Sequence, residues 1–327
     1  MRSSLGFALV LVTTLAACDG GGSTGGDDTT EPDAPGTIEP PARGFQITSA
    51  DITIMPGQEI TYCYYFRTPN TEPMAISKWK SVMTQGSHHM IMYTTTTDVM
   101  PPGSFSASNC GQSTSTTNPA IWTYAAQNIE TEIQLPLDDG GGKPLAQLIN
   151  PNTPAYFQMH YLNPSDAPIV VHVTLNANAL DVGAPYTLTA PFITHNFGIR
   201  IPPMSVGYTE TKTCTTPTNT KFWMLSTHAH KQAVKTKVTN GTPASTNVAF
   251  ESTDWEHPGS KSWSGAPFYT FDNNQLTFSC TYDNPTTREI RFGQSAATDE
   301  MCMATGYFFP AAGPVTCACV AGGCGNF

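Results

Sequence analysis

The sequence predicts an all-β fold, organised as two consecutive antiparallel β-sandwich domains of jelly-roll type. Helical periodicity of apolar residues is almost absent along the chain. Short segments rich in Thr, Val, Ile, Tyr and Phe are instead separated by Pro, Gly and Asn, as strands are separated by turns. A chain of 327 residues is also longer than a single hydrophobic core comfortably supports.

Nine segments carry the strand pattern most clearly. They cover residues 45–54, 58–66, 129–135, 155–161, 169–175, 220–226, 247–250, 275–280 and 289–292. A stretch with Gly183, Pro185 and Pro191 interrupts the pattern and is the best candidate for a domain boundary. We therefore expect an N-terminal domain over residues 44–183 and a C-terminal domain over residues 184–327.

The beginning of the chain is typical of an exported bacterial protein. A basic residue and a short apolar run, too short to span a bilayer permanently, precede Leu15-Ala16-Ala17-Cys18, which resembles a lipobox. We expect a signal peptide over residues 1–17, a lipid on Cys18, and a membrane-anchored protein that faces the periplasm or the cell exterior. Residues 18–43 are rich in Gly, Ser, Thr, Pro and acid, which predicts a flexible tether.

Charge excludes one class of partner. The net charge is −10, and residues 19–43 hold a large share of it, so the acidic balance says little about the folded part. Only 15 residues are Lys or Arg, and they form no basic run, which argues against nucleic-acid binding. No later segment is apolar enough to cross a bilayer, so we expect membrane contact only through the lipid on Cys18.

Cysteine content indicates disulfide bonds. The chain has 9 cysteines, and removing Cys18 leaves an even number, which in an exported chain favours four disulfides. The remaining cysteines are Cys63, Cys110, Cys214, Cys280, Cys302, Cys317, Cys319 and Cys324. Spacing alone does not choose among their pairings.

His228-Ala229-His230 is the first candidate metal-binding pattern. In a strand, residues i and i+2 point to the same face, so both imidazoles can reach one ion. A thioether from Met301 or Met303 would make a soft ligand set, which suits copper best. Cys302 would fix the backbone beside either methionine if it formed a disulfide. By itself a His-x-His pair is more often a solvated strand face.

His88, His89 and His160 form the second candidate group. Neighbouring residues of a regular strand point to opposite faces, so His88 and His89 can serve one metal only at a bulge or a strand end. Gly86-Ser87 before them makes such a departure plausible. Without this departure from regular pleating, one of the two neighbouring histidines would be on the surface and the other would be buried.

Other residues give weaker signals. We interpret His172, His195 and His257 as non-ligands, because His172 has the position of a half-exposed strand residue and the other two lie in turn-rich segments. The sequence lacks a Gly-x-Ser-x-Gly elbow and a phosphate-binding glycine loop, so a serine hydrolase and a dinucleotide enzyme have little support.

The order of four motifs resembles a known enzyme family. His-His, Gln-Met-His-Tyr, His-Ala-His and Asp-Glu-Met-Cys follow one another as in the type II, ascorbate-dependent copper monooxygenases, the family of peptidylglycine α-hydroxylating monooxygenase and dopamine β-monooxygenase. The resemblance covers nearly the whole exported part, from about Cys63 to Tyr307.

The resemblance implies roles for particular residues. His88, His89 and His160 would hold an electron-storing copper, and His228, His230 and Met301, rather than Met303, would hold the copper that meets dioxygen. Gln158 is a candidate for the electron route, although a polar strand residue is an equally good interpretation. The family also implies the pairs Cys63–Cys110 and Cys280–Cys302. Cys214 would pair with one of Cys317, Cys319 and Cys324, and which one stays open.

The implied enzyme is an oxidoreductase with two coppers per chain. It would hydroxylate an aliphatic C–H bond of a small-molecule or peptide substrate, using dioxygen and two electrons from ascorbate or another donor. Peptide-amidating members have an arginine and a tyrosine where this chain has Ser226 and Thr305, which argues against a peptidylglycine substrate. The alternatives are a periplasmic copper storage or delivery lipoprotein, or a purely structural β-sandwich with the six residues scattered.

Overall fold

The fold is all-β in a computed structural model that describes residues 38–107, 110, 117–296 and 298–326. Within these residues the chain contains strands and one 3-10 turn, η1 (Asp272–Asn274), and no α-helix. Nearly all strand pairs are antiparallel. The all-β prediction is therefore confirmed. The predicted signal peptide, the lipidated Cys18 and most of the tether lie outside the described residues.

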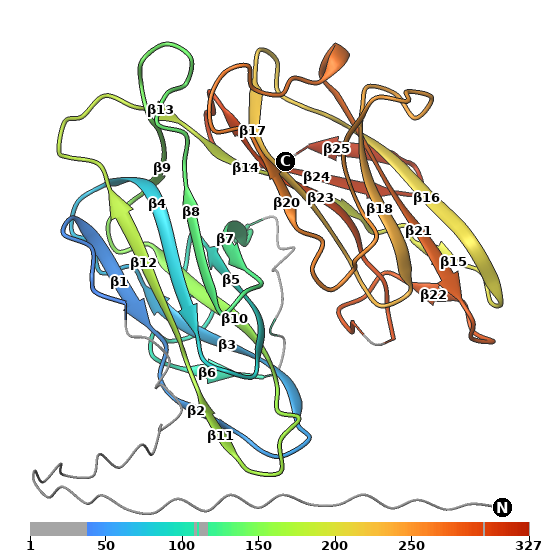
Figure 1. The fold of residues 1–327 in the computed structure, drawn as a ribbon, viewed down its shortest axis with the longest axis horizontal. Coiled ribbons are helices and arrows are strands. Elements are labelled where there is room, and N and C mark those ends of the chain that lie inside the picture. The colour runs from blue at the N-terminus through green and yellow to red at the C-terminus, as the bar shows by residue number, and fades with distance from the viewer. Residues whose placement is uncertain (1–37, 108–109, 111–116, 297, 327) are drawn as a thin grey trace, which may run out of the picture. The chain divides into compact units, whose positions relative to one another are not determined.

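The N-terminal strands form two facing sheets (Figure 1). One sheet contains, in spatial order, β1 (Gly44–Thr48), β12 (Val173–Ala179), β4 (Met74–Met83), β9 (Leu145–Ile149) and β13 (Thr187–Leu188), with β8 (Glu130–Gln134) also paired to β4. The other contains β6 (Phe105–Ser106), β3 (Glu59–Arg67), β10 (Pro154–Leu162), β5 (Ser87–Thr94) and β7 (Ile121–Ala126). A small ribbon joins β2 (Ile52–Ile54) to β11 (Ile169–Val171). Side chains such as Trp79 from one sheet and Phe157 from the other bury a common core.

The C-terminal strands repeat this layered arrangement. One sheet contains β20 (Ser260–Ser262), β17 (Lys221–Ala229), β23 (Cys302–Phe309), β14 (Ala190–Asn196), β24 (Val315–Val320) and β25 (Gly323–Asn326). The facing sheet contains β16 (Ser205–Thr215), β21 (Gln275–Asn284), β18 (Ala233–Asn240) and β19 (Val248–Ser252), and β15 (Arg200–Ile201) pairs with β22 (Ile290–Arg291). Leu225 from the first of these sheets and Phe278 from the second are buried in a common core.

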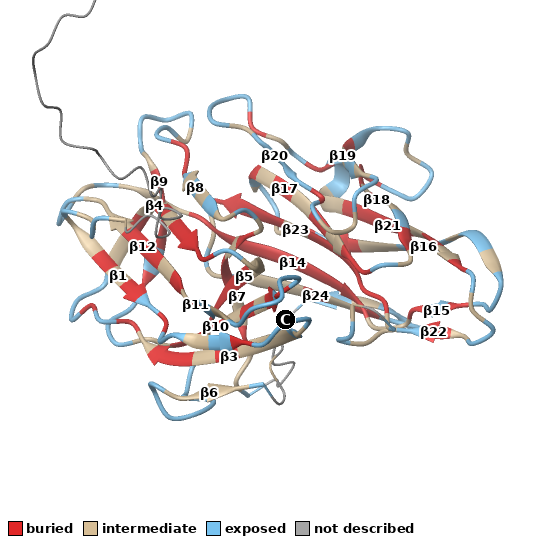
Figure 2. Cartoon of the chain, turned by 60° about the horizontal axis from the view of Figure 1, so that its bottom comes forward, coloured by how far each residue is buried: buried red, intermediate tan, exposed pale blue. Residues whose placement is uncertain are grey.

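The described residues form one compact unit. The N-terminal core includes Trp223, Tyr307 and Phe309, which come from strands of the C-terminal sandwich. Figure 2 shows that buried residues follow the strands and that exposed ones gather in the connections. The end of the expected tether packs on this unit, since Gln46 donates a hydrogen bond to the carbonyl of Ile38 at 2.8 Å.

All nine predicted segments contain strand, but their limits differ. Segment 45–54 is divided into β1 and β2, and segment 169–175 is divided into β11 and β12 at His172. Strand β17 continues past the predicted end at residue 226 to Ala229. Strands such as β4 and β16 were not among the predicted segments. Lys and Ser interrupt the apolar residues of β4, and β16 is a mainly polar strand with one face exposed.

Candidate functional site

A bulge brings His88 and His89 to one site. In the pairing of β10 with β5, His160 lies opposite His89 and the next pair is Tyr161 with Ser87, so His88 is the extra residue. The bulge follows Gly86, whose φ of 88° few other residues adopt easily. The departure from regular pleating that the sequence required for a shared site is therefore present.

The three imidazoles converge closely enough for one metal ion. The ligand nitrogens of His88, His89 and His160 all lie within 4.8 Å of one another. The Nδ1 atoms of His88 and His89 are 3.1 Å apart. The ring centroids of His89 and His160 are separated by 5.2 Å. Three imidazoles at this separation are a suitable donor set for copper.

Two carboxylates orient the outer nitrogens of this group. Nε2 of His160 lies 2.9 Å from a Glu59 carboxylate oxygen, and Nε2 of His88 lies 2.7 Å from one of Glu256. A carboxylate that accepts a hydrogen bond from Nε2–H leaves the Nδ1 lone pair for a metal. Glu256 follows β19, so a loop of the C-terminal sandwich supports a histidine of the N-terminal one.

Glu256→Gln should weaken copper binding at His88, His89 and His160 by about 10–100-fold, because metal-ligand histidines depend on such partners. A competition titration with a Cu(I) chelator measures this affinity. The matched control is Glu251→Gln, which removes an equally exposed carboxylate that pairs with Lys235 at 2.9 Å. Equal affinities in the two variants would show that Glu256 does not support the site.

His228 and His230 meet at the end of β17. Their ring centroids are 5.3 Å apart, as the shared strand face predicts. Nδ1 of His230 lies 3.2 Å from the carbonyl oxygen of Asp299, which leaves its Nε2 for another partner. Met301 and Met303 are both buried and pack in one cluster with Ile193. The position of the two thioethers does not by itself choose between them.

A buried carboxylate and a disulfide fix the backbone around Met301. Glu300 accepts hydrogen bonds from the backbone N–H groups of His230 at 3.0 Å, Gln232 at 2.7 Å and Met301 at 3.2 Å. Burial raises the pKa of Glu300 to about 7, although these three donors oppose the shift. Tyr282 donates to the Met301 carbonyl at 2.8 Å, and Cys302 is bonded to Cys280. Glu300 thus links the backbone of His230, a candidate imidazole ligand, to that of Met301, the candidate thioether ligand.

One cavity of about 410 Å³ is lined by all six predicted ligands. They are His88, His89, His160, His228, His230 and Met301. Burial lowers the pKa of His228 to about 3, and the neighbouring His230 adds to the shift. Burial also lowers the pKa of His89, with smaller contributions from His160 and from the C-terminal pair. His228 and His89 are therefore neutral at pH 7, which is the form of histidine that binds metals.

The two histidines that were expected in turn-rich segments have other surroundings. His195 is not in a turn but in β14, where it is buried and stacks on Phe197 at 5.2 Å. His257 stacks on His88 with ring centroids 5.5 Å apart. The contact of His257 with His88 joins a loop to a strand far away in the chain, so local sequence could not reveal it, whereas the contact of His195 with Phe197 is local. His172 is half-exposed and lies 3.1 Å from Asp51, away from the cavity.

His195→Phe should make folding less sensitive to acid. Burial lowers the pKa of His195 from its ordinary 6.5 to about 4. The unfolded chain binds a proton here below pH 6.5 and the folded chain does not, so stability is lost as the pH falls from 6.5 to 4. The substitution should remove ~3 kcal/mol of this loss.

Urea unfolding of both proteins at pH 7.5 and at pH 4.5 measures the difference. His172→Phe, which removes a half-exposed histidine outside the cavity, serves as the comparison variant. An acid sensitivity of His195→Phe that equals that of the parent protein would contradict the assignment.

Gln158, the candidate for the electron route, lines the cavity and donates a hydrogen bond to the Cys110 carbonyl at 3.1 Å. This contact holds Gln158 against the Cys63–Cys110 disulfide. Among the hydrogen bonds found in the described residues, none joins Gln158 to a candidate ligand histidine. Its role stays a prediction.

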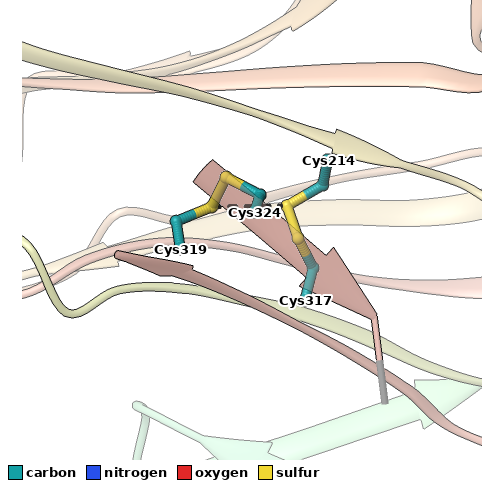
Figure 3. Close-up of side chains that lie close together, drawn as sticks. All are labelled: Cys214, Cys317, Cys319 and Cys324. Carbon is teal, nitrogen blue, oxygen red and sulfur yellow. Dashed lines mark hydrogen bonds between the residues drawn. A yellow bond between two sulfur atoms is a disulfide. The ribbon is translucent and has the colours of Figure 1, made fainter. Parts of the chain in front are cut away.

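Two of the disulfides are the pairs that the resemblance implies. Cys63 is bonded to Cys110, and Cys280 to Cys302. The pairing that spacing left open is Cys214 with Cys317 and Cys319 with Cys324. Figure 3 shows these two bonds side by side, and the Sγ atoms of Cys214 and Cys319 are 3.8 Å apart.

Comparisons with known proteins add no identification. No protein-family model matches the chain, and no curated protein matches it. The crystal structure of the PBSX exported protein XepA aligns with 81% of this chain and 86% of that one, at 9% identity and a TM-score of 0.18. This similarity is too low to carry an argument. The described residues include no helix long and apolar enough to cross a membrane.

Proposed function

We propose that this protein is a copper-dependent monooxygenase with two copper ions per chain. The observation that supports the proposal best is the convergence of the six candidate ligands, from distant parts of the sequence, on one cavity. A purely structural sandwich gives no reason for five buried or half-buried histidines and a methionine to meet. Four disulfides suit the oxidising compartment that the expected lipoprotein leader implies.

The two groups differ in the chemistry that they favour. Three imidazoles tolerate both oxidation states of copper, whereas a thioether favours Cu(I). When bound, copper would supply one-electron redox chemistry and the activation of dioxygen. The overall reaction inserts one oxygen atom into a C–H bond and reduces the other to water, and it consumes two electrons from ascorbate or another donor and two protons.

The chain's own residues position the ligands and limit water. Glu59 and Glu256 orient His160 and His88, and Glu300 ties the segments of His230 and Met301. Trp122 and Phe292 pack beside the two methionines and make this part of the cavity apolar. A dry, preorganised surrounding favours the intended oxidation over side reactions.

Copper content and oxygen consumption test the proposal together. The fully loaded protein should contain two coppers per chain, and ascorbate should drive oxygen uptake in the presence of a substrate. A single copper at saturation would contradict the two-site arrangement. Tight Cu(I) binding without ascorbate-dependent oxygen uptake, over a broad panel of small molecules and peptides, would favour storage or delivery instead.

Met301→His should retain copper but lose turnover, because a third imidazole replaces the thioether that favours Cu(I). Met303→His is the matched comparison, since both methionines are buried in one cluster. Oxygen uptake and copper content of the two variants separate the possibilities. Normal hydroxylation by Met301→His would assign the thioether to Met303 or to neither residue.

A further inference from the structure

A second cavity adjoins the candidate copper cavity. It has a volume of about 360 Å³, which is within the range of small-molecule sites. The two cavities share wall residues that include His89, Trp122 and His228. A molecule in the second cavity would therefore lie next to a candidate ligand from each histidine group.

Aromatic and aliphatic side chains form much of its wall. Trp122, Ile193, Trp223, Met224 and Tyr307 all line it. Trp223 and Tyr307 are stacked, with ring centroids 5.1 Å apart. Their polar atoms are engaged elsewhere, because Trp223 Nε1 donates to Thr189 at 2.8 Å and the Tyr307 hydroxyl donates to the Thr123 carbonyl at 3.1 Å. These two rings therefore offer apolar surface to an occupant.

The polar part of the wall carries almost no charge. Ser226 and Thr305 lie directly opposite each other on β17 and β23, and both line the cavity. The Ser226 hydroxyl donates to the Gly259 carbonyl at 2.5 Å. Among the described lining residues the only carboxylate is that of Glu132, whose side chain is 49% exposed and pairs with Lys78 at 3.7 Å. No lysine, arginine or aspartate of the described chain lines it.

We propose that this cavity binds the substrate, and that the substrate is a neutral small molecule with an aromatic or aliphatic body and few polar groups. Calling the ligand a substrate rests on the proposed function. The preference for a neutral ligand depends on the cavity alone. An anion would lose its hydration here and find no counter-charge, and a cation would find only the half-exposed Glu132, which already pairs with Lys78. An apolar body would gain from contact with the two stacked rings and with Ile193.

Three probes of one shape test the preference. Phenethyl alcohol is neutral, phenylacetate is an anion and phenethylamine is a cation, and all three have a phenyl ring with a short chain. Their binding to the full chain as isolated, without added reductant, is measured by ligand-observed NMR titration. The alcohol should bind at least about tenfold more tightly than either charged probe, which corresponds to about 1.4 kcal/mol. Equal or tighter binding of a charged probe, or no binding of the alcohol, would overturn the proposal.

A charge placed in the wall should reverse the preference. Ser226→Arg should bring phenylacetate binding at least to the level of the alcohol, because the guanidinium supplies the missing counter-charge. Ser205→Arg introduces the same charge on β16, outside both cavities, and should leave the preference unchanged. An unchanged preference in Ser226→Arg, with its near-ultraviolet circular dichroism retained, would place the probe elsewhere and overturn the assignment.

The outcome does not depend on turnover. Preference for the alcohol without copper-dependent oxygen uptake would support the binding site and contradict the proposed function. Two coppers and oxygen uptake together with preference for a charged probe would support the proposed function and contradict the inference of a neutral ligand.

Discussion

Replacing His228 and His230 together by alanine should remove one of two copper ions and abolish ascorbate-dependent oxygen uptake. Loss of an outer partner of a metal ligand already costs about 10–100-fold in affinity or activity, so loss of two ligands should exceed that range. The other ion should remain, because His88, His89 and His160 converge within 4.8 Å without help from the second pair. Copper content and the Cu(II) electron paramagnetic resonance spectrum measure both effects.

Two further variants make this result specific. His88→Ala with His89→Ala should remove the other copper, and His172→Ala should retain both, since His172 pairs with Asp51 away from the cavity. All six ligands line one cavity, so a single shared metal cluster is the competing arrangement. Loss of both ions from either double variant would support that cluster and contradict two separate sites.

The fold class was accessible from the sequence because strands and turns leave local traces. The nine segments with the clearest pattern all contain strand. The pairing of these strands was not accessible, because it joins residues far apart in the chain. The parallel pairing of β14 with β24 is an example.

The candidate site divides in the same way. Spacing predicted that His228 and His230 share a face, and it predicted the need for a bulge at His88. It did not indicate Glu59, Glu256 or Glu300, since an acidic residue in a strand or loop is usually solvated. Glu59 and Glu256 lie outside the motifs, and Glu300 lies inside Asp-Glu-Met-Cys but acquires its partners only when β17 and the segment before β23 meet.

The two neighbouring disulfides that join β16, β24 and β25 should contribute unequally to the free energy of unfolding. The Cys214–Cys317 bond closes a loop with a sequence separation of 103, whereas Cys319–Cys324 closes one of 5. If a disulfide acts mainly on the entropy of the unfolded chain, its contribution grows with the logarithm of that separation.

Replacing Cys214 and Cys317 together by alanine should therefore lower the free energy of unfolding by ~4–5 kcal/mol, against ~2 kcal/mol for Cys319 and Cys324. Urea unfolding of both double variants measures these values. Both partners must be replaced, because a lone Cys214 thiolate, 3.8 Å from Cys319, could attack that sulfur. The Cys214–Cys319 bond would form, the Cys319–Cys324 bond would break, and Cys324 would leave as a thiolate. Equal losses in the two double variants would show that local packing, and not loop closure, sets the contribution of these two disulfides.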